Sequence, residues 1–205
     1  MKNDLFSIGP FTVHGYGLMI AIGVLSAYYM VEYRAKKKQM DWEKVFPLTV
    51  WSVLGGFLGS KILYLLTRLP DILANPALLG SSIKDGFVVY GGIIGGILTA
   101  WIYCKCTKWN FWKIFDIAMP AVAMAQGFGR IGCLLAGCCY GIELDPANPI
   151  GIVFHNSAYA PNDVALLPTQ IISSVLDFAN CFVLLALSKK LKTDGQVASC
   201  YLIFY

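Results

Sequence analysis

The sequence predicts an all-α integral membrane protein, a polytopic bundle of helices that cross the bilayer. Hydrophobic residues make up 57% of the 205 residues, charged residues only 14%, and the mean hydropathy is +0.63. Soluble domains carry roughly a quarter charged residues, so this composition excludes an ordinary soluble domain. Several apolar windows also reach the roughly 20 residues that a spanning helix needs.

These windows predict five spanning helices and the beginning of a sixth. The five cover residues 11–34, 46–67, 88–105, 114–136 and 170–188, and the sixth opens near Val197. The first window is too long for a signal-peptide core and is followed by the basic run RAKKK, which is typical of a retained span. We expect one membrane domain over residues 1–205. Residues 137–169, rich in Pro, Asn and Gly, form a loop of the length that usually carries function.

Basic residues cluster in alternate loops, and this pattern predicts the orientation in the membrane. One set of loops carries Arg34, Lys36, Lys37, Lys38, Lys44, Lys105, Lys108, Lys113, Lys189, Lys190 and Lys192, and the other carries only Lys2, Arg68 and Lys84. Since basic loops stay on the cytoplasmic side, we expect the N-terminus and residues 69–87 and 137–169 to lie outside. The basic residues gather on no single face, which argues against a nucleic-acid partner. Asp116, close to Lys113, is expected at the inner membrane interface.

With this orientation, polar residues of separate helices fall in the outer half of the bilayer. Tyr16 and His14 lie near the outer end of the first predicted helix, Lys61 lies in the outer half of the second, and Tyr90 begins the third. Arg130 lies about 22 Å along its helix from the inner end at a rise of about 1.5 Å per residue. Their convergence predicts a site in the outer leaflet.

Arg130 is the charge that most needs an explanation. A charge inside the bilayer costs at least a few kcal/mol, so it is usually paired, extended to the interface or functional. The guanidinium suits the phosphate of an anionic lipid, which it can bind through two parallel hydrogen bonds. A structural role for Arg130, such as binding a carbonyl or a headgroup, stays open, and Lys61 can equally reach the interface.

Small residues and cysteines form two further patterns. GGFLGS (55–60), GGIIGG (91–96) and GFGRIG (127–132) have spacings that let helices pack closely, with a cavity for lipid tails as the alternative. On the outer side, Cys133, Cys138 and Cys139 have the spacing C-x4-C-C, which matches neither a redox C-x-x-C nor a zinc knuckle. We therefore predict no metal site and no cofactor, while an outer disulfide stays open.

Four stretches resemble the prolipoprotein diacylglyceryl transferase family: FSIGPFTVHGYGLM, VVYGGIIGG, DIAMPAVAMAQGFGRIGCLLAGCCYG and LPTQ. They follow in the family's order and cover essentially the whole chain, and GRxG after a DxxxP helix is the most specific part. The resemblance implies a seven-helix enzyme of the bacterial plasma membrane. Such an enzyme moves the diacylglyceryl group of phosphatidylglycerol to the lipobox cysteine of a preprolipoprotein signal peptide and releases glycerol phosphate.

The resemblance also implies site residues. Arg130 matches the arginine of GRxG and would stabilise the departing phosphate, and Tyr16 matches a functional tyrosine that would hydrogen-bond the headgroup. Tyr90 stands at the position of the family's histidine and completes the expected catalytic set. The expected substrate-binding set is Arg130, Lys61, Gly91, Gly92, Gly129, Gly132 and Gln170.

The chain departs from the family pattern at several of these positions. A tyrosine, with an ordinary pKa of about 10, is a poorer base at neutral pH than the histidine it replaces. Cys133 and Cys138 replace an asparagine and a glutamate, and Leu167 and Ser173 replace a histidine and a later glutamate. The sequence also stops at CYLIFY, where the family continues into an arginine-bearing segment and a last helix. These features indicate a divergent or C-terminally shortened member.

Two other functions stay open. One is a noncatalytic lipid-binding protein of the same fold, and the other is a membrane thiol oxidoreductase that uses the outer cysteines. Neither His14, near a helix start, nor His155, in the 137–169 loop, is assigned as the missing base.

Overall fold

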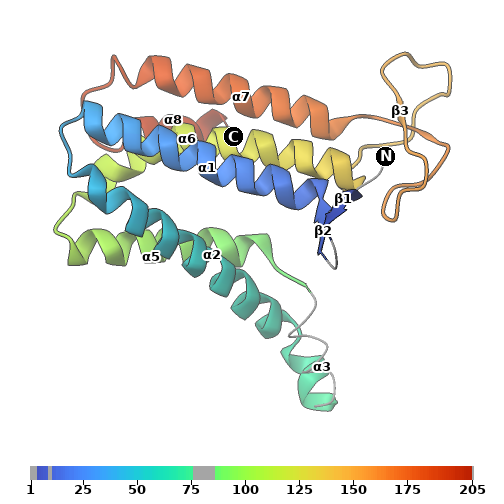
Figure 1. Ribbon diagram of the computed structural model, residues 1–205, viewed down its shortest axis with the longest axis horizontal. Coiled ribbons are helices and arrows are strands. Elements are labelled where there is room, and N and C mark those ends of the chain that lie inside the picture. Colours follow the sequence, from blue (N-terminus) through green and yellow to red (C-terminus); the bar gives the residue numbers. More distant parts are fainter. Residues whose placement is uncertain (1–3, 9–10, 76–85, 205) are drawn as a thin grey trace. The chain divides into compact units, whose positions relative to one another are not determined.

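The computed structural model describes residues 4–8, 11–75 and 86–204 (Figure 1). Lys2 and Lys84, which enter the predicted charge asymmetry, lie outside the described residues. The chain divides into two compact units. We call Met1–Arg34 with Phe115–Tyr205 the terminal unit and Ala35–Ile114 the central unit. The single domain over residues 1–205 stays a prediction.

The long helices agree with the sequence prediction. Within the described residues, five helices are long and apolar enough to cross a membrane, so the chain is a polytopic helical membrane protein. They are α1 (Gly15–Lys37), α2 (Val45–Thr67), α5 (Val89–Cys106), α6 (Phe111–Ala136) and α7 (Thr169–Leu187). The sixth predicted helix is α8 (Gln196–Phe204), and two short helices, η1 (Trp42–Lys44) and α3 (Leu69–Ala74), flank α2.

The predicted start of the first helix at residue 11 is wrong. Strand β1 (Asp4–Ile8) pairs antiparallel with strand β2 (Phe11–His14), and α1 begins only at Gly15. The run FTVH is aromatic and β-branched, which suits a strand better than a helix. Because this strand is apolar and directly precedes α1, hydropathy alone assigns it to the helix.

In the central unit, glycines allow α2 and α5 to touch through their backbones. A Cβ atom at Gly91 would collide with the carbonyl oxygen of Gly59, and a Cβ at Gly95 would collide with that of Gly55. The prediction that GGFLGS and GGIIGG pack helices closely is therefore confirmed. Side chains at these positions would force the helices apart.

We expect Gly91→Ala to destabilise the protein by about 1–3 kcal/mol, because the new methyl group overlaps backbone that has no rotamer to move. Thermal unfolding in detergent, followed by circular dichroism, measures the effect. The matched control is Gly17→Ala in α1, where an added Cβ meets nothing within 4 Å and alanine favours the helix. Equal midpoints for the two variants would contradict the close α2–α5 contact.

In the terminal unit, α6 packs against α1, α7 and α8. Gly127 of α6 accommodates the ring of Phe178 in α7, and a cluster of buried apolar residues joins the three C-terminal helices. These residues are Met119, Ala123, Cys181, Leu184, Val197, Ala198 and Tyr201. Buried residues recur every three or four positions along α7, as expected for one face of a helix. They are Gln170, Ser174, Asp177, Cys181 and Leu184.

Two charged residues near the predicted inner side are buried within the protein. Asp116 is only 4% exposed and accepts hydrogen bonds from the backbone N–H groups of Gly195 (2.8 Å) and Ala198 (2.9 Å), while its place at the membrane interface stays a prediction. Its carboxylate thereby caps the N-terminus of α8, where backbone N–H groups lack partners within the helix. Arg34 is not in a loop: it lies in α1, is buried and donates to the Ile117 carbonyl at 2.8 Å.

The predicted loop at 137–169 lies outside the long helices, as expected, and has a structure of its own. Strands β3 (Ile152–Val153) and β4 (Ala165–Leu166) pair antiparallel. Phe154, Ala160 and Leu166 form a small buried cluster. The loop is therefore a folded element that connects α6 to α7.

Candidate functional site

The candidate site is built where α6 ends and α7 begins. Gly137 adopts a left-handed conformation (φ 74°) directly after α6. The N–H of Cys138 then donates to the Cys133 carbonyl (3.0 Å), and the N–H of Gly137 donates to the Leu134 carbonyl (3.2 Å). This is the hydrogen-bond pattern of a Schellman motif, which turns the chain back across the end of the helix.

The first residues of α7 hold the chain that leaves this turn. Thr169 Oγ1 donates to the carbonyl of Cys139, and Gln170 Nε2 donates to that of Cys138, both at 2.8 Å. Gln170 is only 1% exposed, and its Oε1 has no partner among the described residues. Gln170, predicted to bind substrate, therefore positions the turn after α6 in this structure.

Arg130 lies six residues before the end of α6, about 9 Å along the helix axis. Within the described parts of the chain, its guanidinium makes no hydrogen bond and no ion pair within 4 Å. Asp177 of α7 is 7% exposed and lies one turn from Ser174, whose hydroxyl donates to the Gly127 carbonyl of α6 at 3.0 Å. The guanidinium N–H groups of Arg130 are therefore available to a ligand.

Asp177 is a buried acid that the sequence analysis did not single out. It is the one charged residue within α7 and shares the buried face of Gln170 and Ser174. Its position on the buried face could have been found from the sequence, because Gln170, Ser174 and Asp177 recur at the helical period. An acid on a buried face needs a polar or charged neighbour.

Tyr16 stands in the first turn of α1 and is 43% exposed. A Cβ at Gly132 would lie 3.2 Å from Tyr16 Cδ2, so this glycine makes room for the ring. A Cβ at Gly129 would make an ordinary contact, 3.9 Å from Ile20 Cδ1. The two glycines beside Arg130 thus pack α1 on α6, and substrate contacts at them stay a prediction. The start of α1, the end of α6 and the start of α7 lie at the same end of the terminal unit (Figure 1).

The other predicted residues belong to the central unit. Lys61 Nζ donates to the Gly86 carbonyl (3.1 Å) and lies 4.6 Å from the centre of the Phe87 ring, so it ties α2 to the chain that enters α5. Tyr90 is 74% exposed at the start of α5. Gly91 and Gly92 face Gly59 and Ser60 of α2. Convergence of this group with Arg130 stays a prediction.

The two histidines occupy different settings. His14 ends strand β2, next to α1. His155 lies exposed in the loop, and its Nδ1 is 2.6 Å from Asp163 Oδ1. That contact engages His155 with a loop carboxylate.

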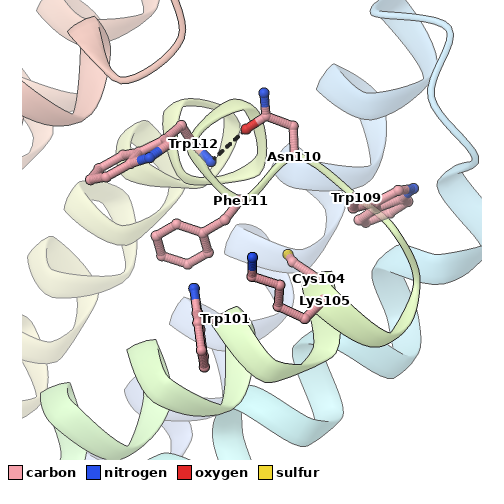
Figure 2. A pocket seen from close by; sticks show the side chains of 7 residues that line it. All are labelled: Trp101, Cys104, Lys105, Trp109, Asn110, Phe111 and Trp112. Atoms are coloured by element: carbon pink, nitrogen blue, oxygen red, sulfur yellow. Dashed lines mark hydrogen bonds between the residues drawn. The ribbon is translucent and has the colours of Figure 1, made fainter.

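A pocket of about 340 Å³ lies in the central unit, between the end of α5 and the start of α6 (Figure 2). Its lining consists of Trp101, Cys104, Lys105, Trp109, Asn110, Phe111 and Trp112. Tryptophan and lysine beside helix ends are typical of the zone where a membrane meets water. This pocket contains none of the predicted site residues, and its composition indicates an interfacial anchor.

Comparison with known proteins decides the family. Residues 3–205 match the family model described as prolipoprotein diacylglyceryl transferase. The chain belongs to this family. It is 44% identical to the phosphatidylglycerol–prolipoprotein diacylglyceryl transferase of Clostridium tetani over 206 residues, covering 100% of this chain and 81% of the relative. It is also 42% identical to transferase 2 of Clostridium perfringens, covering 100% of this chain and 79% of that protein. The resemblance noted in the sequence is confirmed.

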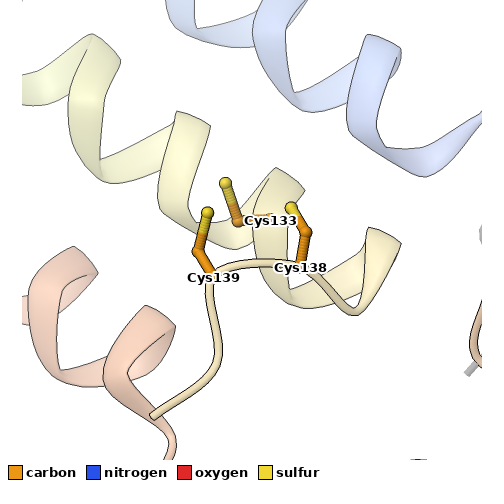
Figure 3. Close-up of side chains that lie close together, drawn as sticks. All are labelled: Cys133, Cys138 and Cys139. Carbon is orange, nitrogen blue, oxygen red and sulfur yellow. The ribbon is translucent and has the colours of Figure 1, made fainter. Parts of the chain in front are cut away.

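In this member of the diacylglyceryl transferase family, the cysteines that replace the expected asparagine and glutamate, Cys133 and Cys138, lie together with Cys139. The Sγ atoms of Cys133, Cys138 and Cys139 all lie within 4.8 Å of one another, and all three thiols are free (Figure 3). Burial raises the pKa of the Cys138 thiol above its ordinary value. A raised pKa lowers the thiolate fraction of Cys138 at neutral pH.

Proposed function

We propose that this chain transfers the diacylglyceryl group of phosphatidylglycerol to the cysteine thiol of a prolipoprotein. The observation that carries the proposal is Arg130, a guanidinium inside an apolar helix whose donors are not used by other described residues. Family membership and the names of the clostridial relatives support the same reaction.

The reaction forms one bond and breaks another at a glyceryl carbon. The cysteine sulfur attacks this carbon, the carbon–oxygen bond to the phosphate breaks, and glycerol phosphate leaves with the electron pair. Arg130 binds the phosphate oxygens through two charge-assisted hydrogen bonds and stabilises the charge that develops there. Tyr16, at the same end of the terminal unit, hydrogen-bonds the headgroup.

The thiol proton also needs a path. In this proposal the departing phosphate accepts it as the carbon–oxygen bond breaks, so the protons balance. Tyr90 stands where the family has a histidine. A phenol is a weaker base at neutral pH than the imidazole expected at this position, so we expect slower transfer than in members that carry the histidine.

The proposal also includes an orientation. The N-terminus and the 137–169 loop lie outside the bacterial plasma membrane, where phosphatidylglycerol and the signal peptide of a preprolipoprotein meet. The segregation of basic residues between loops supports this orientation.

The test is an assay with the purified full-length protein, phosphatidylglycerol and a lipobox peptide. We expect mass spectrometry to show a diacylglyceryl addition to the peptide, and none to a peptide with serine in place of the cysteine. The Clostridium tetani relative serves as the positive control. If the relative modifies the peptide and this chain only binds the lipid, the noncatalytic alternative is correct.

A further inference from the structure

The three thiols at the end of α6 have the geometry of a metal-binding group. Their sulfur atoms are all within 4.8 Å of one another (Figure 3). With metal–sulfur bonds of about 2.3 Å, three sulfurs around one ion lie about 4 Å apart. Small side-chain rotations would therefore bring Cys133, Cys138 and Cys139 onto a single ion.

The backbone holds these residues in place before any ion binds. The Schellman motif folds Cys138 back toward Cys133, and Cys139 adopts a left-handed conformation (φ 57°). Thr169 and Gln170 fix the carbonyls of the two adjacent cysteines. Sites held by such hydrogen bonds lose less entropy when the ligand is captured.

We propose that Cys133, Cys138 and Cys139 bind a thiophilic closed-shell metal ion, of the class of Zn²⁺ or Cu⁺. Thiolates favour such soft or borderline ions over Mg²⁺ or Ca²⁺. The three thiols supply three ligands, and each one that coordinates releases its proton. A fourth position stays available to water or to a substrate thiol.

This proposal departs from the prediction of no metal site. The linear spacing C-x4-C-C matches no familiar zinc pattern, because such patterns assume particular turns between the ligands. Here the cap of α6 provides a different turn, which places residues five apart in the sequence beside each other.

The position of the site has a consequence for transfer. Tyr16 Cδ2 lies 3.2 Å from the position of a Cβ at Gly132, and Cys133 directly follows Gly132 in α6. A bound ion therefore lies close to the residue assigned to the lipid headgroup, and we expect its occupancy to slow transfer. This consequence rests on the proposed function, whereas metal binding itself does not.

The experiment titrates the reduced, purified protein with Cd²⁺ and follows the ultraviolet charge-transfer band of the cadmium–thiolate bonds. We expect one equivalent per chain, bound in competition with Zn²⁺ so that excess Zn²⁺ raises the Cd²⁺ concentration needed for saturation. Cys133→Ser, Cys138→Ser and Cys139→Ser should each weaken binding at least about tenfold. The matched control is Cys106→Ser, an exposed cysteine of α5 outside the cluster, which should bind Cd²⁺ like the wild type.

Three results would overturn the proposal. The first is a triple serine variant that binds Cd²⁺ as strongly as the wild type. The second is a disulfide among the three cysteines in protein purified without reductant, which would assign the cluster to redox chemistry. X-ray absorption of the Zn²⁺-loaded wild type needs no variant to fold: we expect three sulfur neighbours at about 2.3 Å, and only oxygen or nitrogen neighbours would also refute the site.

Discussion

Arg130→Ala should lower the rate of diacylglyceryl transfer by at least about 100-fold, the usual cost of removing one donor that stabilises charge in a transition state. Alanine keeps the helix but removes both hydrogen bonds to the leaving phosphate. The peptide mass assay measures the rate, and a vesicle-binding assay with phosphatidylglycerol measures affinity separately. Loss of rate at saturating lipid would locate the effect in the chemical step.

Two further variants sharpen this test. Arg130→Lys should recover little of the rate, because an ammonium group cannot form the paired hydrogen bonds of a guanidinium. Arg68→Ala is the control: Arg68 is exposed, pairs with Asp71 at 3.1 Å and should leave the rate unchanged. A lysine variant as fast as the wild type would refute the two-bond role of Arg130.

Asp116→Ala should destabilise the protein by about 2–4 kcal/mol, since it removes two charge-assisted hydrogen bonds from the buried start of α8. It also deprives the buried Arg34 of a favourable neighbouring charge. The unfolding midpoint in detergent should fall accordingly. The expected loss exceeds that of an exposed cap because water cannot replace the carboxylate at a buried helix end.

Comparison variants separate the cap from a general loss of charge. Asp116→Asn keeps one acceptor oxygen and should fall between the wild type and the alanine variant. Asp71→Ala removes an exposed carboxylate and should change stability by less than about 1 kcal/mol. If Asp116→Ala unfolds at the wild-type temperature, the carboxylate does not stabilise α8.

The long helices were predictable because hydropathy and length are local properties of the chain. The six predicted helices match α1, α2, α5, α6, α7 and α8 to within a few residues. The exception, the strand at Phe11–His14, shows the limit of this signal: apolar composition alone does not separate a strand from a helix.

The site was predictable only in part because its contacts join residues far apart in the sequence. Arg130 could be identified by its charge in an apolar helix. Asp116 could not be recognised as a cap, because the N–H groups that it binds lie about 80 residues away. The same holds for Gln170, whose partner belongs to a turn 32 residues earlier. Such pairings depend on packing, which neither hydropathy nor a motif records.

The hydrogen bonds at the base of the 137–169 loop hold its two ends together independently of its tip. Gly141 N–H donates to the Leu167 carbonyl (3.0 Å), and Leu167 N–H donates to that of Ile142 (2.9 Å). Together with the bonds of Thr169 and Gln170, they close the base of the loop that carries β3 and β4. A change in the sequence of the loop tip can therefore be accommodated without displacing the end of α6 or the start of α7, which these bonds join.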